Sequence, residues 1–152
     1  MSLPRIGITA GDPAGIGPEI ARKAMEDARV LASCEPLYYG PEQSFPAGVL
    51  SGDAGRAAYE TIVRAVRDAQ AGGIQAIATA PINKEALSLA GLPWRGHTEL
   101  LAELTHAPRV AMMFWSPQLR VVLATIHIPL AEVPSALTVE SLTGIIDFCT
   151  PK

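Results

Sequence analysis

Short apolar runs alternate with helix-type patterns along this chain, and this alternation restricts the fold more than any other feature of the sequence. The runs at residues 5–9, 34–40 and 74–80 have the composition of strands. Helix-type patterns lie between and after them, at residues 18–30, from about residue 59 until Gly72, and at residues 81–91. This order predicts a layered αβα fold with a largely parallel sheet. The small apolar residues of 74–80 are typical of a fully buried strand.

The second half of the chain continues with both kinds of element. We expect a short helix at 96–104, strands at 109–115 and 119–128 joined through Ser116-Pro117-Gln118, and a last amphipathic helix at 137–149. The 152 residues suffice for one ordinary domain, and we find no internal repeat or clear linker. The sequence therefore predicts a single α/β unit over residues 1–152.

Composition and charge argue against several classes of partner. A net charge of −3 provides no concentrated basic surface, which binding to nucleic acid or to an anionic membrane requires. Cys34 and Cys149 form neither a metal-ligand spacing nor a disulfide framework, and the sequence opens without a long apolar leader. No apolar run approaches the roughly 20 residues of a membrane span. We expect a cytoplasmic protein that binds neither nucleic acid nor membrane.

The stretch ITAGDPAGIGPEI, residues 8–20, resembles a strand that enters a glycine-rich turn and then a helix. It lacks the third glycine of the dinucleotide fingerprint, and no lysine follows as in a P-loop. Gly11, Gly15 and Gly17 still surround Asp12, so backbone N–H groups of the turn could face an anion. A tight corner, with Asp12 in a local hydrogen bond to the backbone, explains the pattern equally well.

His97 stands at a predicted helix start, in RGHTEL. Its ring, the Thr98 hydroxyl and the free N–H groups of the first turn could converge on a phosphate. In the alternative interpretation Thr98 is the N-cap, Glu99 lies near the positive end of the helix dipole, and His97 is simply solvated.

Three further polar residues stand near predicted element ends. His127 ends an apolar strand just before Pro129, where an imidazole could bind a metal, although a catalytic zinc usually takes three protein ligands. Lys84 opens a helix after a strand and could meet a substrate anion or simply face water. His106 is typical of a helix C-terminus and receives no role.

Four blocks in this order, ITAGDPAGIGPEI, APINKEAL, GHTELLAEL and VVLATIHIPL, strongly resemble the 4-hydroxythreonine-4-phosphate dehydrogenase family of pyridoxine (vitamin B6) and pyridoxal phosphate biosynthesis. The resemblance covers nearly all of the chain. It implies a fold similar to isocitrate and isopropylmalate dehydrogenases. It also implies an oxidoreductase that uses NAD and a divalent metal (zinc, magnesium or cobalt) to oxidise a small phosphorylated hydroxy-amino acid, which then decarboxylates, at the interface of a homodimer.

The resemblance also carries over residue by residue. His97 and Thr98 would contact the substrate, His127 would be one metal ligand, and Asp12, Gly15 and Lys84 stay possible ligand contacts. No catalytic residue is assigned.

The family's two other metal-binding histidines lie in a C-terminal portion that has no match here, so the resemblance implies a shortened member with an incomplete fold and ligand set. Four alternatives stay open: an inactive truncated homologue or ligand-binding remnant, a dehydrogenase of another phosphorylated hydroxy acid or a ring diol, a split enzyme, and a structural module.

Overall fold

The computed structural model describes residues 2–94 and 96–150, and its chain divides into two compact units, Met1–Ala107 (unit 1) and Pro108–Lys152 (unit 2). We treat each unit by itself. Whether residues 1–152 form one folding domain stays a prediction, because a division by contacts does not say which part folds alone.

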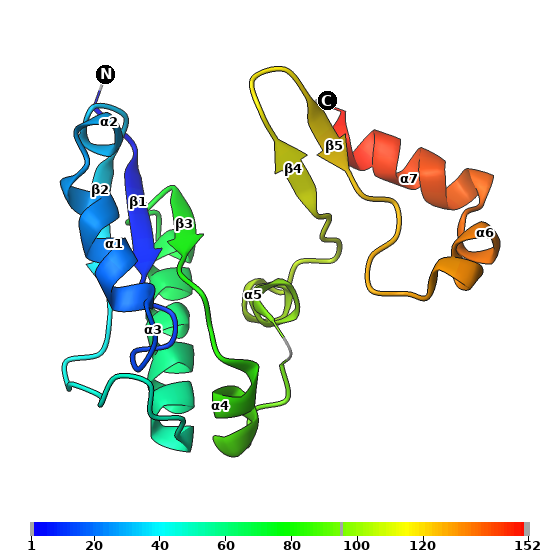
Figure 1. Cartoon of the computed structure of the whole chain (residues 1–152). Helices are drawn as coiled ribbons and strands as arrows, with labels where there is room; N and C mark the ends of the chain where they lie inside the picture. Colours follow the sequence, from blue (N-terminus) through cyan, green and yellow to red (C-terminus); the bar gives the residue numbers. More distant parts are fainter. Residues whose placement is uncertain (1, 95, 151–152) are drawn as a thin grey trace. The chain divides into compact units, whose positions relative to one another are not determined.

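Unit 1 is built on a parallel sheet of three strands, β1 (Arg5–Thr9), β2 (Glu35–Tyr39) and β3 (Ala76–Thr79), in the order β2-β1-β3 (Figure 1). Ile8 of β1 lies opposite Tyr38 on one side and Ala78 on the other. The α/β fold with a parallel sheet that the sequence predicts is thus confirmed.

The helices of unit 1 are α1 (Gly17–Glu26), α2 (Ala28–Leu31), α3 (Gly52–Gln70), α4 (Lys84–Leu89) and α5 (His97–Thr105). Residues 18–30 were expected to form one helix, but Asp27 interrupts it. Its backbone is extended and its carboxylate accepts the N–H of Arg29, at 2.8 Å, so a second helix begins there. Ser51 and Asn83 cap α3 and α4 in the same way.

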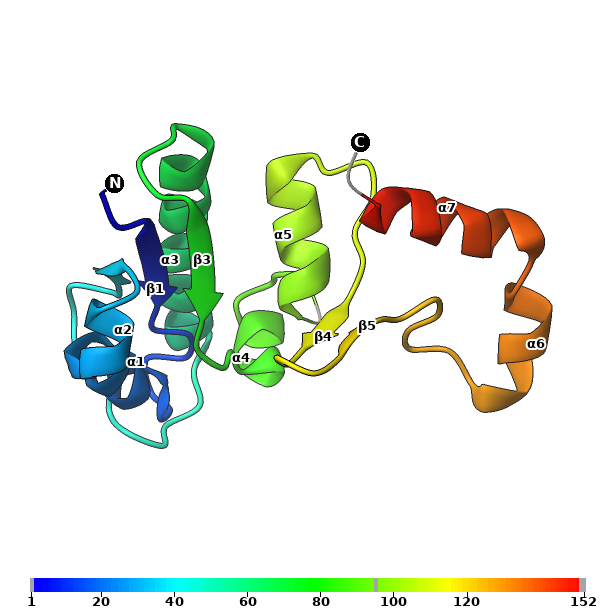
Figure 2. The ribbon, with the colours of Figure 1, turned by 90° about the horizontal axis from the view of Figure 1, so that it is seen from above.

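Long helix α3 covers one face of the sheet, and α1 and α2 cover the other (Figures 1 and 2). On the α3 side, Ala65 packs with Tyr39 and Ile74. Farther along α3, Ile62 and Val66 pack with Leu100 of α5, and all three side chains are buried. The apolar period expected around residues 59–66 is therefore the period of a buried helix face.

Strand β3 corrects one expectation. Its residues Ala76, Ala78 and Thr79 are exposed, whereas the sequence favoured a fully buried strand. The reason is topological: β3 pairs with β1 on one side, and no described strand pairs with its other side. Small apolar residues therefore mark an edge strand here.

Unit 2 holds an antiparallel pair, β4 (Met113–Trp115) and β5 (Arg120–Val122), followed by the 3₁₀ turn η1 (Leu130–Glu132), α6 (Val133–Ala136) and α7 (Val139–Cys149). The strand expected over 119–128 is wrong beyond Val122, where the pairing with β4 stops. Thr138 and Ser141 form a capping box that starts α7. Among residues 108–150 no side chain is buried.

One hydrogen bond joins β2 to α3 in unit 1. The Tyr39 hydroxyl donates to the Asp68 carboxylate at 2.6 Å, and Tyr39 is only 8% exposed. Burial, with the Asp68 carboxylate next in importance, raises the pKa of Tyr39 from 10.0 to about 12. The folded state therefore holds this proton more tightly than the unfolded state, and the resulting stability is lost as the pH rises from 10 toward 12.

We expect Tyr39→Phe to lower the free energy of unfolding by about 1.5 kcal/mol at neutral pH, because it removes a hydrogen bond to a charged group. The variant should also lose less stability than the native chain in alkali. Urea unfolding at a series of pH values measures both effects, and Tyr38→Phe, which keeps a ring under the Arg22 guanidinium, is the matched control. An equal alkaline loss in Tyr39→Phe and the native chain would contradict the assignment.

Candidate functional site

The turn after β1 folds tightly against the segment that follows β3. Gly11 has a φ of +66°, and a Cβ there would overlap the carbonyl oxygen of Pro81. The N–H of Asp12 donates to that same carbonyl at 2.8 Å. The Asp12 carboxylate accepts the N–H of Ala14 at 3.0 Å, which is the local hydrogen bond of the corner interpretation. The turn is thus a tight, hydrogen-bonded corner and not a loose loop.

The same turn forms one wall of an open hollow of about 570 Å³. It is lined by Asp12, Gly15, Ile16, Gly17, Pro81, Ile82, Asn83, Lys84 and Glu85. The structure thus brings together three of the residues that the sequence singled out, Asp12, Gly15 and Lys84. Sequence reasoning overlooked Asn83, whose side chain accepts the N–H groups of Glu85 and Ala86. An Asn just before a helix was the available signal.

The charges of this hollow are mixed. Lys84 is the one ammonium among its lining residues, and Asp12 and Glu85 bring two carboxylates. A bare phosphate would meet repulsion from these carboxylates as well as attraction to Lys84. The hollow therefore suits a ligand part that donates hydrogen bonds, such as a hydroxyl group, at least as well as an anion.

Two glycines of this turn provide a matched pair of tests. A Cβ on Gly17 would overlap the carbonyl oxygen of Ala10, whereas one on Gly15 would stand 3.4 Å from the Asp12 carboxylate, in ordinary contact. We expect Gly17→Ala to lower the free energy of unfolding by about 2 kcal/mol or more, and Gly15→Ala to change it by less than about 0.5 kcal/mol. Urea unfolding measures both, and equal effects would show that the turn is not packed as described.

The start of α5 differs from the interpretation in which Thr98 caps the helix and His97 faces water. Gly96 is the N-cap residue, no side chain among the described residues caps the helix, and His97 and Thr98 are its first two residues. The expectation of Thr98 as N-cap with a solvated His97 is wrong, because Gly96 is the N-cap and His97 is half-buried.

One nitrogen of the His97 ring forms no hydrogen bond within the described part of the chain. Its Nε2 atom is buried and has no hydrogen-bond partner among the described residues. Burial lowers the pKa of His97 below 6.5, so the imidazole is neutral at pH 7. Buried polar atoms in proteins are nearly always paired with protein or water, so this nitrogen remains available for a hydrogen bond. Free N–H groups at the helix start add a positive partial charge.

Packing against α3 holds α5 and its first residue in place. Leu100 is fully buried in the cluster with Ile62 and Val66. The Tyr59 and Trp94 rings stack with centroids 5.1 Å apart, and the Trp94 indole donates to the Glu103 carboxylate at 2.7 Å. The chain is therefore fixed just before and just after the His97 position.

His127 lies in unit 2, and its setting corrects the sequence expectation. It follows the end of β5 by several residues, in a bend, instead of ending the strand. It is exposed, and its φ of 57° is left-handed, which is uncommon for residues other than glycine. Among residues 2–94 and 96–150, no group of three His, Cys, Asp or Glu residues could hold a metal ion. His127 is therefore one ligand at most.

His106 provides a natural comparison with His127. It is the C-cap of α5, as its helix-end position suggested, with a φ of 51°. Left-handed backbone strains an L-residue by about 1 kcal/mol, and at a helix end it is a common conformation for glycine.

We expect His106→Gly and His127→Gly each to preserve the free energy of unfolding or raise it by up to about 1 kcal/mol, since relief of strain is offset by the flexibility of glycine. If His127 is kept for metal binding, His127→Gly alone should weaken zinc binding in equilibrium dialysis. A clear loss of stability in both variants would contradict the left-handed backbone, and unchanged zinc binding in His127→Gly would count against a ligand role.

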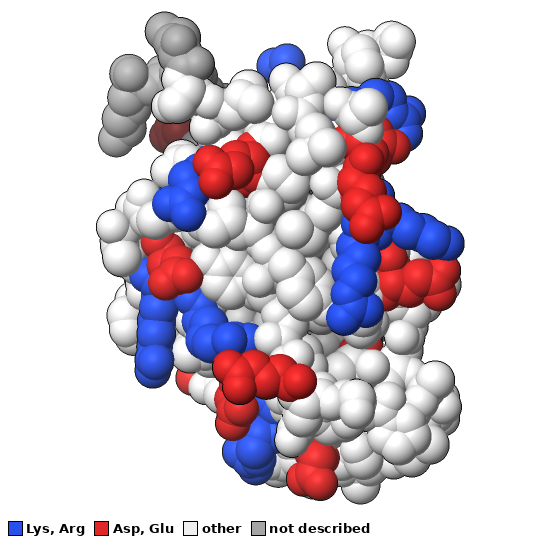
Figure 3. All heavy atoms as spheres, turned by 90° about the vertical axis from the view of Figure 1, so that its left-hand side faces the viewer, with Lys and Arg blue, Asp and Glu red and all other residues white. Residues whose placement is uncertain are grey.

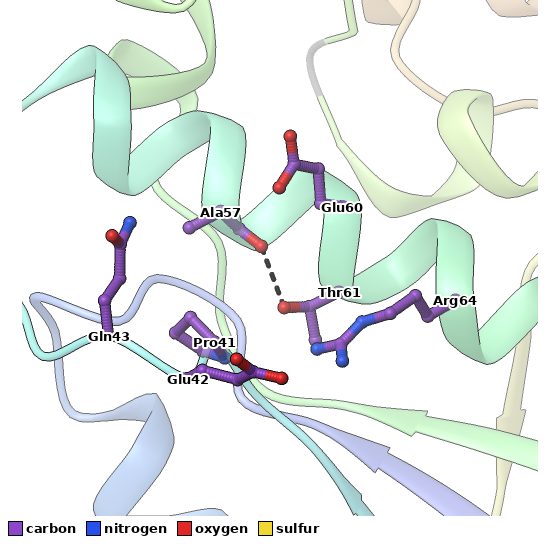
Figure 4. Close-up of a pocket in the computed structure, with 7 residues that line it drawn as sticks. All are labelled: Pro41, Glu42, Gln43, Ala57, Glu60, Thr61 and Arg64. Carbon is purple, nitrogen blue, oxygen red and sulfur yellow. Dashed lines mark hydrogen bonds between the residues drawn. The ribbon is translucent and has the colours of Figure 1, made fainter.

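A further hollow of about 460 Å³ lies between α3 and the segment after β2 (Figure 4). Glu42 and Gln43 come from that segment, and Glu60, Thr61 and Arg64 come from α3. The Thr61 hydroxyl already donates to the Ala57 carbonyl at 2.8 Å, and Arg64 donates to the Gly40 carbonyl. The Thr61 hydroxyl and the Arg64 guanidinium are thus paired within the protein, and we assign the hollow no ligand.

The surface seen in Figure 3 mixes acidic and basic side chains, and neither sign forms a continuous patch on that face. The described helices include none with the length and apolar character needed to cross a membrane.

Comparison with known proteins identifies the family. The family model for the pyridoxal phosphate biosynthetic protein PdxA matches residues 14–152. A 4-hydroxythreonine-4-phosphate dehydrogenase of Desulforapulum autotrophicum is 40% identical over 185 residues, which cover 94% of this chain and 54% of that protein. A D-threonate 4-phosphate dehydrogenase of Cupriavidus necator is 39% identical over 171 residues, covering 86% of this chain and 51% of that one.

The solved structure of a 4-hydroxythreonine-4-phosphate dehydrogenase from Burkholderia phymatum matches with a TM-score of 0.87 and 37% identity. The match covers 97% of this chain and 57% of that one, so this chain spans little more than half the length of the relatives it matches. The aligned 185 residues of the Desulforapulum protein also exceed the 152 residues here, so the relative has additional residues within the matched stretch. With matches this extensive, the chain belongs to the PdxA family of pyridoxal phosphate biosynthetic proteins, dehydrogenases with an isocitrate/isopropylmalate dehydrogenase-like fold.

Proposed function

We propose that this chain carries the substrate-binding part of an NAD-dependent, metal-dependent dehydrogenase that oxidises 4-hydroxythreonine 4-phosphate, with decarboxylation of the product, in vitamin B6 biosynthesis. The proposal rests on the family match along residues 14–152 together with one feature of the site, the buried and unpaired Nε2 of His97 at the start of α5. A relative named for this reaction is 40% identical.

His97 and Thr98 have the chemistry to bind an anionic group of the substrate. A neutral imidazole can donate one hydrogen bond through a ring nitrogen, the Thr98 hydroxyl can donate another, and the first N–H groups of α5 add a favourable dipole. Burial of His97 strengthens such bonds, because water competes less for the donors. A bound phosphate or carboxylate would also supply the partner that Nε2 lacks.

Asp12, Gly15 and Lys84 would contact another part of the bound substrate or NAD. Their common hollow offers an ammonium and carboxylates within one opening. Hydroxyl groups of the substrate or of the NAD riboses can donate to the carboxylates, and a nearby anion can pair with Lys84.

NAD would accept the hydride of the secondary alcohol, and a divalent metal would stabilise the developing oxygen charge. The described residues do not fit a complete metal site, because His127 is a single ligand and no cluster of three candidate ligands exists among them. We therefore derive no step through the metal. We propose that ligands outside the described residues complete the metal site. We also propose that the protein is a homodimer in the cytoplasm.

The Cupriavidus relative favours a second candidate substrate. That protein is named for D-threonate 4-phosphate, another phosphorylated hydroxy acid, at nearly the same identity of 39%. Both substrates contain a phosphate and a secondary alcohol, so a phosphate-binding site at His97 would bind either of them.

Isothermal titration calorimetry of the chain with each phosphorylated substrate tests whether His97 takes part in binding. We expect His97→Ala to weaken binding about 10- to 100-fold, the range expected for one lost hydrogen bond to a charged group. His106→Ala, at the other end of α5, should bind as the native chain does. Equal affinity in native and His97→Ala proteins would remove His97 from the site.

NADH formation in the same samples, with zinc or magnesium added, tests the reaction itself. Turnover of one substrate over the other identifies the substrate. If the chain neither binds nor turns over either compound, the proposed function is overturned.

A further inference from the structure

The segment that joins β2 to α3, residues 41–50, is bonded to the turn after β1 (Figure 1). We call this segment the connector. Pro41 and Phe45 are half-buried, and the other eight residues of the connector are exposed. The N–H of Gly48 donates to the carbonyl of Ala14 at 2.7 Å. An exposed segment thus contacts the backbone of the turn that carries Asp12.

Both ends of the connector are fixed to α3. The Arg64 guanidinium donates to the Gly40 carbonyl just before the connector, and the Ser51 hydroxyl just after it accepts the N–H of Ala54 as the N-cap of α3. Residues 41–43 line the hollow of about 460 Å³ against α3, so they do not fill the space above this helix (Figure 4). Among the described residues, the bond from Gly48 is the one backbone hydrogen bond between the connector and residues 8–20.

That bond fixes the orientation of one peptide group in the turn. The carbonyl of Ala14 and the N–H of Gly15 belong to the same planar peptide unit. The carbonyl accepts from Gly48, and the N–H donates to the Asp12 carbonyl at 3.1 Å. The peptide unit is therefore held at both of its polar groups and cannot rotate without losing both bonds.

The Asp12 carboxylate depends on the same residue. Ala14 is buried, and its own N–H donates to that carboxylate at 3.0 Å. Ala14 is thus bonded to Gly48 through its carbonyl and to Asp12 through its N–H. A shift of the connector is therefore transmitted to the carboxylate, which lines the same hollow as Lys84.

We propose that the connector positions the Asp12 carboxylate for the ligand of this hollow, and that Gly48 is the positioning residue. This inference rests on the proposed function, in which hydroxyl groups of the substrate or of NAD donate to Asp12. A carboxylate that is already ordered does not have to be ordered by the ligand, so the bond from Gly48 increases the affinity for that ligand.

The backbone of Gly48 permits a selective test. Its φ is +74°, a conformation that strains β-branched residues, and a Cβ there would meet no atom within 4 Å. Gly48→Val therefore strains the connector without a clash of the new Cβ. Gly48→Asn introduces a residue that tolerates this conformation. Gly72 just after α3 has a φ of +76° and equally open surroundings, so Gly72→Val is the matched control.

Hydrogen exchange of the chain without ligand tests the positioning directly. Relative to the amides of β1, we expect Gly48→Val to speed exchange of the Ala14 and Gly15 amides at least about fivefold, because the peptide between them is released. Gly48→Asn and Gly72→Val should leave these two relative rates within about twofold of the native values. Native rates in Gly48→Val would overturn the proposal.

Calorimetric titration with 4-hydroxythreonine 4-phosphate and with NAD tests the consequence for binding. We expect Gly48→Val to weaken binding of at least one of these compounds about fivefold, and Gly48→Asn and Gly72→Val to bind both as the native chain does. Equal affinities of Gly48→Val and Gly72→Val for both compounds would overturn the positioning role and leave the proposed function intact. A native chain that binds neither compound would overturn the proposed function and this inference together.

Discussion

Burial of one side of α3 is the interaction on which unit 1 depends. This helix contacts β1, β2 and β3 and also packs against α4 and α5. Gly55 permits the closest approach, because a Cβ there would overlap the Ala86 carbonyl of α4. Ile62 and Val66 then fill the space toward Leu100 of α5. One helix thus fixes the sheet together with the two helices that carry Lys84 and His97.

This arrangement separates two kinds of chemistry within unit 1. At the start of α5, the neutral, half-buried imidazole of His97 and the helix N-terminus offer hydrogen-bond donors, and the one carboxylate in the first turn is that of Glu99. In the hollow near Lys84, carboxylates of Asp12 and Glu85 outnumber the ammonium. The first setting has the donors that a phosphate accepts from, and the second has both acceptors for hydroxyl groups and a cation for an anion.

The sequence predicts local features of this fold well. Strands β1 and β2, the start of α4 near Lys84 and the apolar side of α3 all follow from period and end signals over a few residues. Asp12, Gly15 and Lys84 were singled out one by one, and the parallel pairing of β1 with β3 is what brings their turns to one hollow. The same edge of a parallel sheet collects such turns, so this part of the site was within reach of sequence reasoning.

Other features depend on contacts that no local pattern contains. Strand β3 is exposed because no described strand pairs with its other side, and β5 ends early because its partner β4 has only three residues. Burial of His97 depends on how α5 packs against α3, far away in sequence. A complete set of metal ligands could not be predicted, because the resemblance assigns that role to His127 alone among the residues of the motif blocks.

The central claim is that unit 1 holds its own core, whereas unit 2 buries no side chain among residues 108–150. Hydrogen exchange of the chain alone, resolved by residue, measures this most directly. The account predicts slow exchange for β1 and α3, near the limit set by global unfolding, and fast exchange for β4, β5 and α7 because their hydrogen bonds are not buried. Protection of α7 equal to that of α3, in a monomeric sample, would contradict it.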